Sequence, residues 1–174
     1  MVKRHKVFYS FHYKKDVRRV AQIRNIGSIE GNSPVSSNAW EELRNNGDEA
    51  IMKWIDKNMK NSSCLIVLIG EDTSKRKWVK YEIRHAYKEH KGLLGIYIHN
   101  IKDPQEVKKG NSGKCKQGNN PFELFTLKDG RKLSSIVTCY NPNSEDAYND
   151  IKNNIEKLID NSIEKMNEFY ESQE

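Results

Sequence analysis

The 174-residue sequence contains only three cysteines and four prolines. Cys64, Cys115 and Cys139 are far apart, and none has a partner at metal-ligand spacing, so we expect neither a disulfide framework nor a metal site. No apolar run approaches the roughly 20 residues that a membrane span needs. The basic start is followed by only three apolar residues, so we expect no signal peptide. These absences predict a soluble cytoplasmic protein with no membrane partner.

The charge is positive overall but unevenly distributed. Thirty Lys and Arg residues oppose 24 Asp and Glu residues, which gives +6 at pH 7. Residues 144–174 hold nine acids and three lysines, or −6, so the preceding 143 residues carry +12. A basic body can receive a nucleic acid or a small phosphorylated ligand. Neither an RNP-like aromatic strand pair nor a helix-turn-helix pattern is present, so we do not expect a nucleic-acid partner.

The hydrophobic pattern alternates between strands and helices over a length that suits one domain. Apolar or β-branched runs predict strands at residues 6–11, 64–69, 93–98 and 135–140. Helical periodicity predicts helices at about 16–26, 47–60, 75–90 and 144–172. Asp16 is the expected N-cap of the first helix, and Asn143-Ser144 that of the last.

Two segments lack periodicity and are expected to be loops. Residues 27–38 are rich in Gly, Ser, Asn and Pro, with a short edge strand near residues 28–30. Residues 100–121 are rich in Lys, Gly and Asn. Within them, Gly110–Cys115 lacks the spacing of a phosphate-binding loop and is expected to be a flexible insertion.

The order of elements predicts a flavodoxin-like three-layer α/β sandwich with a mostly parallel central sheet. Its core covers about residues 4–142, and the long C-terminal helix, about 144–172, docks on it. In such folds, ligands bind outside the carboxyl ends of the strands, where the strand order reverses. Residues 10–12 and 70–73 occupy those ends, which predicts the ligand site there.

One carboxylate on the helix after this site is a candidate for chemistry. Trp78 and Glu82 are four residues apart and share a helical face with several apolar residues. A carboxylate among apolar side chains at the rim of a cleft has a perturbed proton affinity, as catalytic groups often have. The alternative interpretation is a surface glutamate paired with Lys80, Arg84 or another basic group.

Four segments stand in an order that resembles TIR-like domains. They are Lys6–His12, Leu68–Thr73, Trp78–Ile83 and Leu94–Asp103. More narrowly, the chain is similar to the TIR-like proteins of the bacterial Thoeris anti-phage defence system. The resemblance covers about residues 4–125, and the last strand and helix fit the fold without diagnostic residues.

This resemblance implies an activity. Enzymatic TIR domains cleave NAD+ at its bond to nicotinamide and carry a catalytic Glu in a Trp-x-x-x-Glu pattern, which Trp78 and Glu82 match. NAD+ would be the substrate, with no cofactor. The product implied is a cyclic ADP-ribose isomer, which diffuses to and activates a separate effector protein. Self-association is a further implied property. The alternative is a non-catalytic TIR-like module that signals by protein–protein assembly.

Within that interpretation, other residues receive substrate-binding roles. Phe11 and Trp78 are expected to stack on the base or nicotinamide, and His12 and Arg76 to bind the pyrophosphate. Ser10 either donates a hydrogen bond to the ligand or closes a turn.

Three further positions are weaker candidates. Trp40 either shapes the pocket or, as we favour, packs on the next helix. His99 is structural or a minor pocket residue, and His85 and His90, five apart, do not share a helical face for a metal.

Overall fold

The computed structural model describes residues 5–27, 29–32 and 37–174. Ser28 and residues 33–36, which belong to the first expected loop, lie outside the described residues.

Five parallel strands form one sheet in the order β2-β1-β3-β4-β5. They are β1 (His5–Ser10), β2 (Ile29–Gly31), β3 (Cys64–Ile69), β4 (Gly92–Tyr97) and β5 (Thr138–Tyr140). β1 lies between β2 and β3, so the strand order reverses at β1, as in flavodoxin-like folds. Every residue of β3 is buried, which explains its continuous apolar run. The predicted α/β fold is confirmed.

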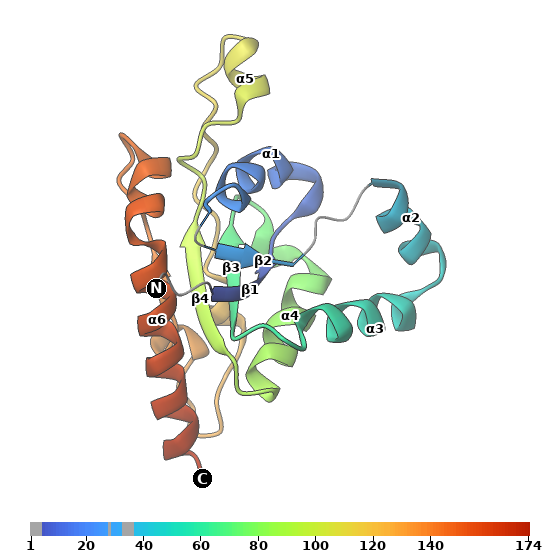
Figure 1. Ribbon diagram of the computed structural model, residues 1–174, viewed down its shortest axis with the longest axis vertical. Coiled ribbons are helices and arrows are strands. Elements are labelled where there is room, and N and C mark those ends of the chain that lie inside the picture. The colour runs from blue at the N-terminus through green and yellow to red at the C-terminus, as the bar shows by residue number, and fades with distance from the viewer. Residues whose placement is uncertain (1–4, 28, 33–36) are drawn as a thin grey trace.

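Helices cover both faces of the sheet and complete the three layers (Figure 1). α1 (Tyr13–Arg24) and α6 (Ala147–Ser172) share one hydrophobic cluster with Val7, Tyr9 and Ile66. α3 (Asp48–Met59) and α4 (Lys77–Lys88) share the other cluster with Phe8 and Leu65. Alternate residues of β1 therefore point to opposite faces, as a strand's period of two requires.

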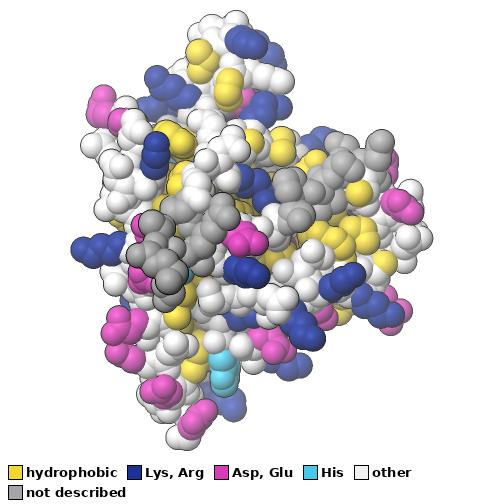
Figure 2. Space-filling model, in the orientation of Figure 1, with side chains coloured by type: hydrophobic (Ala, Val, Ile, Leu, Met, Phe, Trp, Pro, Cys, Tyr) yellow, Lys and Arg dark blue, Asp and Glu magenta, His cyan; other side chains and the backbone are white. Residues whose placement is uncertain are grey.

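The C-terminal helix α6 packs along β4 (Figure 1). Its buried residues form one stripe along the helix, as expected of a helix that docks on the core: Ala147, Ile151, Ile155, Ile159, Ser162, Met166, Phe169 and Tyr170. Near its end, Tyr170 Oη donates a hydrogen bond of 2.7 Å to the carbonyl of Lys91. Acidic side chains gather along the edge that α6 forms (Figure 2). Within the described residues, none of the helices combines the length and apolar character that crossing a bilayer requires.

Both predicted N-caps are wrong. α1 starts at Tyr13, and the Nδ1 atom of His12 accepts a hydrogen bond from the Lys15 amide at 3.3 Å, so Asp16 lies inside the first turn. At α6, Asp146 is the N-cap, because its carboxylate accepts a bond from the Asn149 amide. In each case, another acceptor stands closer to the first free amides than the residue that the pattern favours.

Two short helices were not expected. α2 (Ser37–Asn45) starts inside a segment whose composition suggested a loop, and Trp40 and Leu43 pack against the core cluster on the α4 face. α5 (Pro104–Lys108) interrupts the second expected loop, with Asp103 as its N-cap. The last strand is also shorter than predicted, because residues 133–135 form a 3-10 turn.

Candidate functional site

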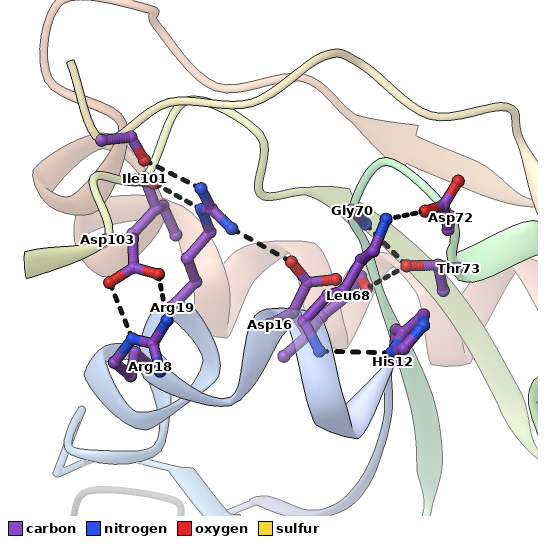
Figure 3. Close-up of polar contacts among 12 residues, drawn as sticks. His12, Asp16, Arg18, Arg19, Leu68, Gly70, Asp72, Thr73, Ile101 and Asp103 are labelled. Carbon is purple, nitrogen blue, oxygen red and sulfur yellow. Dashed lines mark hydrogen bonds and ion pairs between the residues drawn. The ribbon is translucent and has the colours of Figure 1, made fainter. Parts of the chain in front are cut away.

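The carboxyl ends of β1 and β3 meet next to the start of α4. After β3, the Gly70 amide donates a 2.8 Å hydrogen bond to Thr73 Oγ1, which in turn lies 3.4 Å from the Leu68 carbonyl (Figure 3). This turn leads through η1 (Thr73–Lys75) into α4. The turn therefore fixes where the first residues of α4 lie relative to the end of β1.

Glu82 is on the buried side of α4. The residue is 8% exposed, and Val79, Ile83 and Ala86 of the same helix are also buried. Burial raises the pKa of the Glu82 carboxyl well above its usual 4.5, while the nearby Ser10 hydroxyl lowers it by a smaller amount. Among the described residues, no hydrogen bond to the buried Ser10 Oγ meets the usual geometry, so Ser10 acts on Glu82 by proximity rather than through a well-formed bond. The structure thus brings together two of the predicted site residues, Ser10 and Glu82.

The alternative interpretation of Glu82 as a solvated ion-pair partner does not fit this geometry. Within residues 5–27, 29–32 and 37–174, Glu82 forms no salt bridge. Arg84 instead lies 5.9 Å from the ring centre of Phe125. Trp78, one turn before Glu82, is half-buried, contacts Tyr81 edge to face, and has Lys77 4.9 Å from its ring centre.

His12 and Arg76 also lie near each other. His12 is 8% exposed, and burial, followed by the positive charge of Arg76, lowers its pKa. Arg76 is exposed and is the N-cap residue of α4. A cation at this position adds to the positive end of the helix dipole, so the start of α4 suits an anion.

Phe11 is separated from Trp78. Phe11 packs with the cluster on the α1 face, where its ring contacts Tyr13 and has Arg24 5.7 Å from its centre. Trp78 packs with the cluster on the α4 face. The two rings therefore lie on different sides of the sheet and do not form one stacking platform.

The sequence did not point to a buried ion network on the α1 face (Figure 3). Arg19 donates to Asp16 Oδ1 at 3.2 Å and to the carbonyls of Ile101 and Gly113 at 2.9 and 2.8 Å. Arg18 makes a two-bond contact with Asp103, with both distances 2.8 Å. The spacing of Asp16 and Arg19, three residues apart on one helix, is the sequence feature that could have predicted their ion pair.

An open hollow of about 270 Å³ lies beside this network. Its lining includes Lys14, Glu71 and Glu106 as well as the ion pairs. Acidic and basic groups are equally numerous there, so their charges largely cancel. We therefore place the phosphate-binding potential at the start of α4 rather than in this hollow.

The two remaining candidates, Trp40 and His99, contact neighbouring side chains of the fold. Trp40 is half-buried and packs against the core cluster on the α4 face. His99 is buried, and its Nε2 lies 3.1 Å from Asn100 Nδ2.

Residues 8–103 match the family model described as "Thoeris protein ThsB, TIR-like domain". This chain belongs to the ThsB TIR-like family. The matched region contains the end of β1, the turn after β3 and all of α4, so the site described above lies inside it.

A curated ThsB relative from Bacillus cereus (strain MSX-D12) bears the name "Putative cyclic ADP-D-ribose synthase ThsB1". It is 33% identical over 136 residues, an alignment that covers 74% of this chain and 68% of the relative. Family membership confirms the resemblance seen in the four segments of the sequence.

Proposed function

We propose that this chain cleaves NAD+ at the bond between nicotinamide and ribose and closes the product into a cyclic ADP-ribose-type nucleotide. That nucleotide would activate an effector protein of the same anti-phage defence system. The observation that carries the proposal is Glu82, a buried carboxyl group on α4. Among the described residues, the Ser10 hydroxyl is the one polar neighbour that affects its pKa. The name of the Bacillus cereus relative supports the same product class.

Cleavage of the bond between nicotinamide and ribose does not require an acid catalyst. Nicotinamide leaves as a neutral pyridine, so no proton has to be supplied to it. The ribose left behind resembles an oxocarbenium ion, and an ionised carboxylate beside it stabilises the developing positive charge. In this proposal, Glu82 is that carboxylate, and the apolar residues around it keep water away.

The product depends on which nucleophile reaches the ribose. Water would give ADP-ribose, whereas an adenine nitrogen or a ribose hydroxyl held nearby would close a ring. The exposed Arg76 and the half-buried Lys80 give the start of α4 a positive character suited to the pyrophosphate. In the proposal, Arg76 and His12 hold the pyrophosphate, and Trp78 covers the nicotinamide side.

The experiment compares purified wild-type protein with Glu82→Gln, followed by chromatography of nicotinamide and nucleotide products. Glu82→Gln should reduce nicotinamide release by about 100-fold or more. Glu89→Gln is the matched control, because Glu89 is an exposed glutamate at the end of the same helix and should retain full activity.

The same pair of variants is then tested in phage-infected cells, whose extracts are assayed for a small molecule that activates the effector. Product formation by wild type and Glu89→Gln, and none by Glu82→Gln, supports the proposal. Wild-type turnover by Glu82→Gln refutes the assignment of Glu82. An effector response that occurs without any nucleotide would favour signalling by protein assembly.

A further inference from the structure

One carboxylate links the two sides of the expected ligand site. Asp72 lies in the turn between β3 and η1, and its Oδ2 accepts a hydrogen bond from Nζ of Lys15 in α1. Its Oδ1 accepts a hydrogen bond of 3.2 Å from Nζ of Lys75 in η1. We refer to Lys15, Asp72 and Lys75 as the Asp72 bridge. The bridge joins the segments that follow β1 and β3, where a fold of this strand order binds its ligands.

Asp72 does not have the usual role of an acid at the start of a helical turn. It is the N-cap residue of η1, but its carboxylate accepts no hydrogen bond from the amides of residues 73–75, which the structure describes in full. Both carboxylate oxygens contact lysine ammonium groups instead. These contacts lower the pKa of the Asp72 carboxyl below its usual 3.8, so the group is ionised at neutral pH. Asp72 therefore supplies an anion to two cations on different elements.

The Asp72 bridge has more positive charge around it than its own two lysines. Arg76, the next residue along the chain, is exposed and forms no salt bridge with any described residue. His12 lies at the same edge (Figure 3). Because His12 Nδ1 accepts a hydrogen bond from the Lys15 amide, its neutral ring carries the proton on Nε2 and can donate to an anion.

Two other acids near the bridge do not remove this excess. Glu71 and Asp16 raise the pKa of Lys15 by less than Asp72 does, and Asp16 is already paired with Arg19. Lys15 and Glu71 also line the open hollow of about 270 Å³, which leaves room for a ligand beside the bridge. Both the charge and the space at this edge therefore suit an anion with more than one negative charge.

We propose that Asp72 holds the place of the substrate's pyrophosphate in the ligand-free protein, and that the pyrophosphate displaces it to bind Lys15 and Lys75. This inference rests on the proposed function and adds two lysines to the groups that hold the dinucleotide. The Lys15 and Lys75 side chains are 52% and 72% exposed, and ion pairs so exposed are weak, so Asp72 is readily displaced. A pyrophosphate carries two negative charges and can accept a charge-assisted hydrogen bond from each lysine.

Binding of ADP-ribose tests the displacement, because this ligand keeps the pyrophosphate but has no nicotinamide to lose. Calorimetry at low ionic strength compares wild type, Asp72→Asn and Glu89→Gln, after circular dichroism has shown that each is folded. Glu89→Gln is the matched control, since it removes the same charge from an exposed position at the end of α4. Asp72→Asn should bind ADP-ribose about three- to tenfold more tightly than wild type and Glu89→Gln. No gain in Asp72→Asn, or an equal gain in Glu89→Gln, overturns the inference.

The shared lysine is tested by a double-mutant cycle. In the wild-type background, Lys15→Gln removes a partner from the ligand and from Asp72 alike, so it should weaken ADP-ribose binding by about threefold or less. In the Asp72→Asn background, the lysine has only the ligand to bind, and the same substitution should weaken binding by about tenfold. Lys88→Gln, at the exposed end of α4, should bind as wild type does. Equal effects of Lys15→Gln in the two backgrounds would mean long-range charge rather than displacement, and would overturn the inference.

Two further measurements identify the ligand and separate this inference from the proposed function. Inorganic pyrophosphate should also bind Asp72→Asn more tightly than wild type, and its binding without any binding of ADP-ribose overturns the assignment to a dinucleotide. Nicotinamide release is measured in extracts of phage-infected cells that express each variant. Release by wild type with no gain of affinity in Asp72→Asn overturns this inference alone. Absence of release from wild type, with the displacement observed, refutes the proposed function and leaves the anion site in place.

Discussion

Asp16 and Glu82 are both buried carboxyl groups near the carboxyl edge of the sheet, but their surroundings differ. On the α1 face, Asp16 is 2% exposed and is paired with Arg19, which also bonds two carbonyls. On the α4 face, the Ser10 hydroxyl is the one polar group in the described part of the chain that favours the charged form of Glu82. Burial raises the pKa of both carboxyls, but only that of Asp16 is opposed by an arginine. The comparison separates a carboxylate paired with an arginine, which itself bonds carbonyls of a distant segment, from a carboxyl group that forms no salt bridge with any described residue.

The largest effect is expected from removing the arginine on the α1 face. Arg19→Ala removes the donor to the Asp16 carboxyl and to the Ile101 carbonyl, and one of the two donors to the Gly113 carbonyl, which keeps the Asp103 amide at 2.9 Å. It should lower the free energy of unfolding by about 3 to 5 kcal/mol, measured by urea denaturation. Arg84→Ala, which removes an exposed arginine, should change it by less than about 1 kcal/mol. Equal losses of unfolding free energy in the two variants would contradict the conclusion that the buried arginine on the α1 face stabilises the fold more than the exposed arginine on α4.

The second largest effect is expected in the pH dependence of folding stability that Glu82 causes. Because the pKa of Glu82 is raised above its usual 4.5, the folded protein keeps a proton that the unfolded chain has released. The stability due to this group is full below pH 4.5 and is lost as pH rises toward the folded pKa. Glu82→Gln should therefore gain stability over wild type by about 1.4 kcal/mol per pH unit in that range. Unfolding of wild type, Glu82→Gln and Glu89→Gln from pH 4 to 8 measures it, and a pH-independent difference would refute the raised pKa.

A third variant tests how closely the α1 network packs on the end of β3. A Cβ atom at Gly70 would stand 2.1 Å from Asp16 Oδ2, so the Asp16 carboxyl would have to move. Gly70→Ala should destabilise the protein by about 1 to 3 kcal/mol. Gly27→Ala is the control, because no heavy atom of the described residues lies within 4 Å of its added Cβ. If Gly70→Ala is as stable as Gly27→Ala in thermal unfolding, Asp16 is free to rearrange.

The smallest effect is expected at the exposed end of the same network. The Arg18 side chain is 40% exposed, so its contact with Asp103 should contribute about 1 kcal/mol or less at pH 7. Arg18 lowers the pKa of Asp103 below its usual 3.8, so this stability is present above pH 3.8 and is lost as pH falls through the folded pKa. Urea denaturation of wild type and Arg18→Ala at pH 7 and pH 2.5 should show a difference that shrinks at the lower pH.

Local patterns predicted most of the fold. The apolar run at 64–69 and the apolar stripe along α6 are surfaces that must be buried. The hydrophobic effect depends on the apolar area removed from water and not on which residues cover it, so such patterns can be interpreted without knowing the tertiary contacts. The predictions failed where short polar residues compete for the same backbone amides. His12 rather than Asp16 caps α1, and α2 forms where Ser and Asn suggested a loop.

The candidate site was only partly predictable. The helical spacing of Trp78 and Glu82 placed them on one face, and the strand order placed Ser10 at the same edge. No local pattern could show that Phe11 packs on the opposite side of the sheet, because that depends on the alternation of β1 and on what covers each face.

Composition and periodicity by themselves determined the parallel α/β fold, the basic body with its acidic final helix, and the candidate carboxylate. Only the tertiary structure decided which of the two buried carboxyls is paired. Asp16 and Arg19 are helical neighbours whose other partners, Ile101 and Gly113, are distant in sequence, while Glu82 meets Ser10 across the sheet edge. Charge compensation in a protein interior depends on contacts between distant segments, and those exist only once the chain has folded.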